Sequence, residues 1–226
     1  MTMAAPTVSP EGADDDESVS GATEGATGDT PTRKRLKPGE RRVQILQMLA
    51  ELLQQPGAER ITTAMLARKL DVSEAALYRH FASKAQMFEG LIEFIEQSVF
   101  SMVNRIAESD GDSGATRARK MVMVLLQFGD KNRGMTRVMV GDALVFENER
   151  LVLRMNQFFD RFESQLRGSL RAAAEQAGSP SPTADAQARA SVLTSLALGR
   201  LHRYARSGFK RSPLEHLDAA LALLVE

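Results

Sequence analysis

The stretch Arg60–Phe81 (RITTAMLARKLDVSEAALYRHF) constrains the fold of this chain more than any other segment. Thr62 precedes a short run of apolar residues at helical spacing, Asp71 interrupts that run, and Ser73 precedes a second run. Thr and Ser are favoured N-cap residues, because their hydroxyl groups accept a hydrogen bond from a backbone N–H of the first turn. The pattern therefore predicts a helix, a tight turn and a second helix.

Four apolar side chains can join these two helices into one small core, and Ala67 is short enough to let them approach closely. The four are Leu66, Leu70, Val72 and Leu77. The second helix then keeps a polar face unburied, which a helix needs in order to enter the DNA major groove. An ordinary helical hairpin on the surface of a bundle would give the same pattern, so the motif needs support from the rest of the chain.

The residues that end the second helix supply this support. The run LYRHF closes that helix, and Ser83-Lys84 then begins another. In this pattern the segment resembles the TetR family of bacterial repressors. The similarity continues through SKAQMFEGLIEFIEQS and GDALVFENERL, where the chain resembles members that act as nucleoid occlusion factors. The family usually carries glycine at the turn, but Asp71 is among the side chains that tolerate a left-handed backbone.

The resemblance implies an all-α, TetR-like fold, with an N-terminal three-helix head containing the helix-turn-helix and a C-terminal helical bundle for dimerisation and regulation. We expect three parts in the chain. These are an acidic tail with a basic end at residues 1–37, a helix-turn-helix DNA-binding domain at 38–98, and a dimerisation and partner-binding domain at 99–226.

The formal net charge of zero conceals an uneven distribution. Residues 1–32 hold seven of the 29 acidic residues and no Lys or Arg, so the remainder carries 29 basic against 22 acidic residues. A basic remainder suits a phosphate-rich partner. The first segment is poor in large apolar residues, and we expect it to be disordered. The basic run 33–37 either tracks phosphates or a minor groove, or is a solvated charge cluster.

Apolar residues at helical spacing predict the remaining elements. They predict helices at 40–54, 83–106, 115–131, 147–174 and 184–207, a short helix from Met135, and a closing apolar segment at 212–226. Gly129, Asn132 and Gly134 are expected to mark the break before the short helix. The two long helices near the C-terminus form the predicted dimer interface, packing as a four-helix bundle. Packing within one chain is the alternative.

The candidate DNA contacts follow from a homodimer on a palindromic double-stranded site, with two recognition helices about 34 Å apart. Phosphate contacts are expected from Thr62, Thr63, Tyr78, His80 and Lys84. Base contacts, or positioning of the helix, are expected from Ser73, Glu74, Ala75 and Arg79. Lys84 stands in the first turn of a helix that Ser83 caps, where an anion is favoured.

Phe94 lies off the apolar stripe of the helix at 83–106. At 100° per residue it projects about a quarter-turn from Ile95, which belongs to the stripe. An off-stripe phenylalanine is either covered by another helix or exposed as an anchor for a partner protein.

The resemblance also implies an output. In nucleoid occlusion factors, the DNA-bound protein engages the tubulin-like division protein FtsZ and prevents ring assembly over the nucleoid. Carried over by position, the partner surface comprises Phe94, Met102, Val124, Gln127, Phe128 and Lys131. Some relatives carry arginine in place of Met102 and glycine in place of Gln127. DNA would activate the protein by ordering the head or by assembling several dimers on one site.

Two other interpretations remain open. In a ligand-controlled repressor of the same fold, a metabolite would bind the bundle between about Val122 and Phe162 and release the DNA. In an interaction protein that does not bind DNA, the basic motif would be idle. No polar cluster marks a ligand site in that part of the bundle, which favours nucleoid occlusion.

The sequence offers no support for an enzyme. Cysteine is absent, the three histidines are scattered, and no phosphate-binding loop, dinucleotide fingerprint or nucleophile elbow is present. We expect no cofactor and no metal. No apolar run approaches the ~18 residues of a membrane span, and the N-terminus lacks a secretory pattern. We therefore expect a soluble, cytoplasmic protein associated with the nucleoid and not with a membrane.

Overall fold

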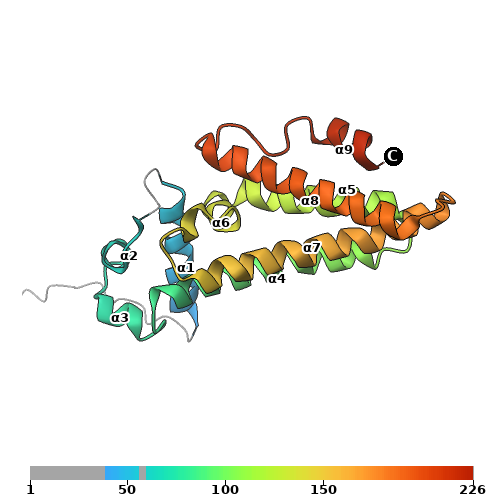
Figure 1. Cartoon of the computed structure of the whole chain (residues 1–226). Helices are drawn as coiled ribbons and strands as arrows, with labels where there is room; N and C mark the ends of the chain where they lie inside the picture. The colour runs from blue at the N-terminus through green and yellow to red at the C-terminus, as the bar shows by residue number, and fades with distance from the viewer. Residues whose placement is uncertain (1–38, 56–59, 226) are drawn as a thin grey trace, which may run out of the picture. The chain divides into compact units, whose positions relative to one another are not determined.

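The computed structural model describes residues 39–55 and 60–225, and these residues form helices and loops without a strand (Figure 1). The helices are α1 (Glu40–Leu53), α2 (Thr63–Leu70), α3 (Glu74–Tyr78), α4 (Lys84–Ala107), α5 (Gly114–Lys131), α6 (Arg133–Met139), α7 (Glu149–Gln176), α8 (Pro182–Arg206) and α9 (Leu217–Val225), with a 3-10 turn η2 (Asp142–Leu144) between α6 and α7. The described residues belong to one compact unit. The expected tail at 1–32 and the basic run at 33–37 lie outside the described residues.

Local hydrogen bonds define the helices of the head, α1 to α3. The Thr62 hydroxyl accepts from the backbone N–H of Met65 at 3.2 Å, and the Ser73 hydroxyl accepts from that of Ala76 at 3.2 Å. Asp71 ends α2 in the left-handed conformation with φ 52°. The predicted caps and the predicted role of aspartate at the turn are therefore confirmed.

The four predicted apolar side chains do meet between α2 and α3. Leu66 and Leu77 are almost fully buried, while Leu70 and Val72 are half-buried and pack against the same core. Leu77 is the one buried residue of α3, so the position of this short helix depends strongly on that side chain. Burying a leucine stabilises a fold by about 1.5–3 kcal/mol.

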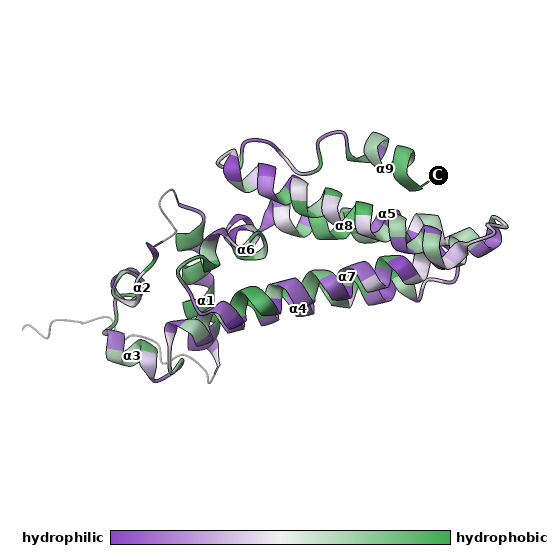
Figure 2. Cartoon of the chain, in the orientation of Figure 1, coloured by the Kyte–Doolittle hydropathy of each residue, from purple (hydrophilic) through white to green (hydrophobic). Residues whose placement is uncertain are grey.

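The bundle, α4 to α8, is organised by long buried stripes. Hydrophobic and hydrophilic residues alternate along each long helix (Figure 2). The buried stripe of α7 comprises Leu151, Met155, Phe158, Phe162, Leu166 and Leu170. Two ion pairs join α7 to α4, with Arg150 2.8 Å from Glu89 and Arg154 2.6 Å from Glu96. The hydrogen bond to Glu96 raises the pKa of Arg154 above its already high usual value.

The expected break at Gly134 is wrong, because this residue lies inside α6. The break is at Asn132, whose side-chain amide donates to the Phe128 carbonyl at 2.8 Å. A Cβ added to Gly134 would stand 1.9 Å from the carbonyl oxygen of Ala50 in α1. Glycine is required here because α1 and α6 approach too closely for a side chain, and the head is thereby packed onto the bundle.

α4 runs without interruption through residues 98 and 99, where the boundary between head and bundle was expected. The head and the bundle thus share one helix. Among the described residues, no helix is both long and apolar enough to cross a lipid bilayer.

Candidate nucleic-acid interface

The outward face of α3 and its flanking residues is polar and accessible. Ser73, Glu74, Ala75 and Arg79 are exposed, and Tyr78 is 45% exposed. His80 is half-buried, and its carbonyl accepts a hydrogen bond from the Arg42 guanidinium. This is the surface expected of a helix that is free to meet a nucleic acid.

A hydrogen-bonded cluster joins the start of α2 to this face. The Thr63 hydroxyl donates to a carboxylate oxygen of Glu74 at 2.5 Å, and the Tyr78 hydroxyl donates to Thr63 at 3.4 Å. Thr63 and Tyr78 thus lie together, as two groups that contact one phosphate must. Glu74 places a negative charge beside them, so its carboxylate must move before a phosphate can approach Thr63.

Thr62 and Ser73 have a structural role that limits what they offer to DNA. Each hydroxyl oxygen accepts a hydrogen bond as an N-cap and keeps its own proton available for donation. Both side chains lie at helix N-termini, where the unpaired backbone N–H groups favour an anion.

Lys84 is already paired in this structure. Its ammonium group forms an ion pair with Glu147, at the end of the segment that precedes α7. The Lys84 side chain is 30% exposed and that of Glu147 is 9% exposed. A phosphate that binds Lys84 must therefore replace a carboxylate that is largely shielded from water.

Sequence reasoning missed two residues of this region. Arg42, in the first turns of α1, stacks 4.1 Å above the Phe81 ring and holds the His80 carbonyl, so it fixes the C-terminal end of the recognition helix. Glu147 stands at the start of the helix predicted at 147–174, and its position there does not indicate a partner for Lys84. Both act on residues more than 35 positions away in the chain, and no local pattern announces such contacts.

The residues carried over as a partner surface lie on α4 and α5. Phe94 is 46% exposed, Gln127 and Lys131 are exposed, and Met102 and Val124 are half-buried. Phe94 and Gln127 are each thirteen residues from the loop that joins the two antiparallel helices, so they lie at the same level.

Phe128 is 7% exposed and belongs to the core. The expectation that its side chain forms part of the partner surface is corrected accordingly. Its neighbours face outward because a helix turns by about 100° per residue, which places Gln127 on the surface when Phe128 points inward.

Comparison with known proteins agrees with this geometry. Residues 45–91 match the bacterial regulatory proteins of the tetR family, and residues 113–226 match the tetracyclin repressor-like C-terminal domain of the SlmA-like type. Nucleoid occlusion factor SlmA of Vibrio atlanticus is 48% identical over 189 residues, which cover 83% of this chain and 95% of that protein. The Vibrio cholerae protein of the same name is 50% identical over 185 residues, covering 81% and 93%.

The chain belongs to the SlmA family of nucleoid occlusion factors. Solved structures of more distant proteins confirm the predicted all-α, TetR-like fold of this SlmA family member. MbdR of Azoarcus sp. CIB superimposes with a TM-score of 0.68 at 16% identity, over 82% of this chain and 97% of that one. FadR of Bacillus subtilis, solved with stearoyl-CoA, gives 0.66 at 16% identity, over 81% and 97%.

Proposed function

We propose that this chain acts as a nucleoid occlusion factor. A homodimer binds palindromic double-stranded DNA and, in the DNA-bound state, inhibits assembly of the FtsZ ring over the chromosome, so that division follows segregation. The observation that carries the proposal is the match to SlmA relatives over more than 80% of the chain, across both the head and the bundle. The protein acts by binding and not by catalysis, in the cytoplasm and on the nucleoid.

DNA binding is assigned to the accessible face described above. Phosphates are contacted by Thr62, Thr63, Tyr78, His80 and Lys84, and bases are contacted, or the helix positioned, by Ser73, Glu74, Ala75 and Arg79. Support comes from the exposure of α3 and from the three N-caps, Thr62, Ser73 and Ser83, which direct backbone N–H groups outward.

Dimerisation is assigned to the outer faces of α7 and α8. Along α8, exposed small residues recur at helical spacing, at Ala184, Ala188, Ser191, Ser195 and Gly199. An apolar side chain is also exposed on each helix, Leu153 of α7 at 54% and Val192 of α8 at 48%. Small residues with apolar neighbours let two helix pairs pack closely as a four-helix bundle. A two-fold axis there places two copies of α3 for half-sites one turn apart.

The FtsZ-binding surface is assigned to Phe94, Met102, Val124, Gln127 and Lys131, with Phe128 supporting them from the core. Phe94 is the anchor of this surface, because it is a large apolar side chain that its own chain leaves 46% exposed. Several dimers on one DNA site would present this surface several times.

Capture of FtsZ by the purified dimer, with and without operator DNA, tests the proposal. We expect DNA to increase the amount captured, and Phe94→Ser to abolish that increase while DNA affinity stays unchanged. Leu223→Ser is the matched control, because Leu223 is 86% exposed on α9, is not part of the proposed surface, and its replacement also removes a large exposed apolar group. No capture on DNA, together with release of DNA by a small molecule, would instead support the ligand-controlled repressor.

A further inference from the structure

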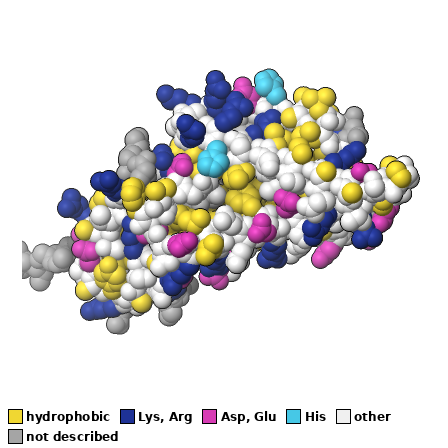
Figure 3. Space-filling model, viewed as in Figure 1, with side chains coloured by type: hydrophobic (Ala, Val, Ile, Leu, Met, Phe, Trp, Pro, Cys, Tyr) yellow, Lys and Arg dark blue, Asp and Glu magenta, His cyan; other side chains and the backbone are white. Residues whose placement is uncertain are grey.

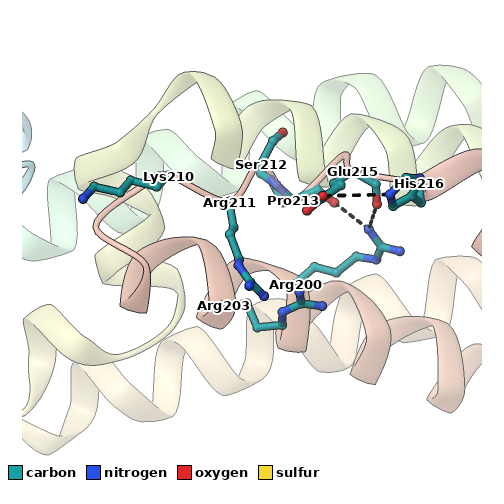
Figure 4. Close-up of a pocket in the computed structure, with 8 residues that line it drawn as sticks. All are labelled: Arg200, Arg203, Lys210, Arg211, Ser212, Pro213, Glu215 and His216. Carbon is teal, nitrogen blue, oxygen red and sulfur yellow. Dashed lines mark hydrogen bonds and ion pairs between the residues drawn. The ribbon is translucent and has the colours of Figure 1, made fainter.

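A cleft that the proposed function does not use lies between the C-terminal end of α8 and the segment 207–216 that leads to α9 (Figure 4). Its volume is about 560 Å³. Arg200 and Arg203 line it from α8 and Arg211 points toward them from the segment, while Lys210 lies at its rim with its side chain extending away from the arginines. Small-molecule sites in proteins typically occupy 300–1,000 Å³, so this cleft can hold a ligand of nucleotide size.

The cleft concentrates positive charge. Lys and Arg side chains gather over this end of α8 (Figure 3). Among the described residues, no carboxylate pairs with Arg203, Lys210 or Arg211, and the single acidic residue of the lining, Glu215, stands 3.9 Å from His216. Like charges that converge on a concave surface raise the local positive potential and attract an anion.

The segment that carries the cleft's cations is held in place by its backbone. One Arg200 nitrogen donates to the carbonyls of Pro213 and Glu215, at 3.1 and 2.7 Å. The Ser207 hydroxyl accepts from the backbone N–H groups of Lys210 and Arg211, at 3.1 and 3.0 Å. These bonds use main-chain atoms, so the charged ends of Lys210 and Arg211 remain available.

Two residues in the segment adopt a conformation that favours glycine. Phe209 has φ 63° and His216 has φ 52°. Phe209 is held by an edge contact with Tyr204, with ring centroids 5.0 Å apart. Such backbone conformations cost of order 1–3 kcal/mol and persist where the surroundings enforce them, often at binding sites.

Arg200 contributes charge to the cleft without offering its Nε to a ligand. This atom is shielded from solvent and has no hydrogen-bond acceptor within the described part of the chain, so an oxygen atom in the cleft cannot reach it. The direct contacts to a ligand are therefore left to Arg203 and Arg211, and Arg200 adds to the positive potential.

We propose that this cleft binds a small soluble ligand with two or three linked phosphates, such as a nucleoside di- or triphosphate. Arg203 and Arg211 supply planar forks that match phosphate oxygens, and Lys210 adds positive charge at the rim of the cleft. A concave site with cations on two opposing walls surrounds a compact anion. Duplex DNA and a lipid surface are extended partners, and they favour charges spread over a convex or flat face.

Calorimetric titration of the full-length dimer with inorganic tripolyphosphate, and separately with ATP, tests the proposal. We expect binding of both ligands, and a decrease in affinity of about tenfold or more in the Arg203→Ser/Arg211→Ser variant. Arg206→Ser is the matched control, because Arg206 is exposed on the last turn of α8 and does not line the cleft. Its affinity should equal that of the wild type.

Operator affinity and the melting temperature of each variant are measured in parallel. Both should be unchanged, because the cleft is separate from the DNA-binding face, and the result therefore does not depend on the proposed nucleoid occlusion. If the double variant melts at a lower temperature, Arg211→Ser alone replaces it, since Arg211 is exposed and its side chain forms no bond within the described chain.

Three results would overturn the proposal. The first is no binding of tripolyphosphate at about 1 mM, a concentration that detects even weak ligands. The second is an equal loss of affinity in the Arg206→Ser control. The third is binding of phosphatidylglycerol vesicles, or of DNA without an operator, through Arg203 and Arg211 when neither polyphosphate binds.

Discussion

The face proposed to bind DNA and the cleft beside α8 differ in how their charged and polar groups are engaged within the chain. On the DNA-binding face, carboxylates already occupy the groups that would meet phosphates, because Glu74 binds Thr63 and Glu147 binds Lys84. In the cleft beside α8, no described carboxylate pairs with Arg203, Lys210 or Arg211. DNA must therefore exchange one set of contacts for another, whereas a ligand in the cleft relieves repulsion between like charges.

This difference has consequences for selectivity. Releasing Glu147 from Lys84 leaves a largely shielded carboxylate without its partner, which opposes each phosphate contact. Only a DNA site that contacts many side chains at once offsets the cost of displacing these carboxylates. The cleft has no comparable internal competitor, so it should bind its ligand with little discrimination beyond charge and size.

α6 lies between the two surfaces. Its Gly134 packs against the Ala50 carbonyl of the head, and Nε of its Arg133 donates to the Tyr204 hydroxyl on α8 at 3.3 Å. Tyr204 in turn packs on Phe209 of the cleft segment. Substitution of Gly134 therefore tests the packing of the head on the bundle, and substitution of charged residues tests one surface at a time.

The largest effect is expected from Gly134→Ala. In most helices this change stabilises by about 1 kcal/mol, but here the new Cβ would stand 1.9 Å from the Ala50 carbonyl oxygen. We expect destabilisation of about 1–3 kcal/mol instead, measured by thermal or urea unfolding. Gly111→Ala is the control, since nothing lies within 4 Å of its added Cβ and the melting temperature should not fall. A melting temperature that rises in Gly134→Ala would contradict the close packing of α1 and α6.

A smaller effect is expected when Lys84 is changed to alanine. Loss of one phosphate contact should weaken binding to operator and unrelated DNA alike, and should reduce the slope of log affinity against log salt by about one per protomer. Titrations at several salt concentrations measure both quantities. An unchanged slope would exclude a phosphate contact at Lys84.

Glu147→Gln tests whether Glu147 competes with a DNA phosphate for Lys84, and it should raise DNA affinity where Lys84→Ala lowers it. Removing the competing carboxylate should increase DNA affinity by about two- to fivefold, the range that a partly exposed ion pair allows. Tripolyphosphate binding to the cleft should not change. A variant with lower DNA affinity would show that Glu147 positions Lys84 for DNA and does not compete for it.

The smallest effect concerns Asp112, which provides a baseline for an exposed ion pair. The Lys120 ammonium stands 2.7 and 2.8 Å from the two carboxylate oxygens of Asp112, and the Ser109 hydroxyl donates to the same carboxylate at 3.0 Å. These hydrogen bonds lower the pKa of Asp112 below its usual value. A lowered pKa in the folded state stabilises the fold above the unfolded pKa of about 3.9, and this contribution is lost as the pH falls through the folded value. Lys120→Gln should raise the pKa of Asp112, measured by NMR titration, and should flatten the decrease in stability at acid pH. An unchanged pKa would assign the shift to Ser109.

Features encoded by neighbouring residues could be predicted from the sequence. Thr62, Ser73 and Asp71 act within a few positions of themselves, so their roles as caps and turn residue follow from residue type and spacing. The position of Phe94 off the apolar stripe follows from the periodicity of one helix, and the structure decides between its two interpretations because the side chain is exposed. The family resemblance added the fold and the assignment of the partner surface.

Contacts between distant segments could not be predicted in this way. Glycine is typical of helix breaks, so the sequence predicts a break at Gly134. Only the close approach of α1 shows why a glycine lies inside a helix at this position. The pair of Lys84 with Glu147 spans 63 residues, and the cleft depends on how the segment 207–216 folds back on α8. Phe128 was misassigned because positional similarity says nothing about burial.

The continuity of α4 has a mechanical consequence. Lys84 is its first residue and Phe94 follows ten residues later, about 15 Å along the same axis at 1.5 Å per residue. An unbroken helix is stiff along its axis, so a tilt of its first turn on DNA would carry to Phe94 together with the helices packed on α4. DNA at Lys84 and the division protein at Phe94 would then contact two points of the same helix.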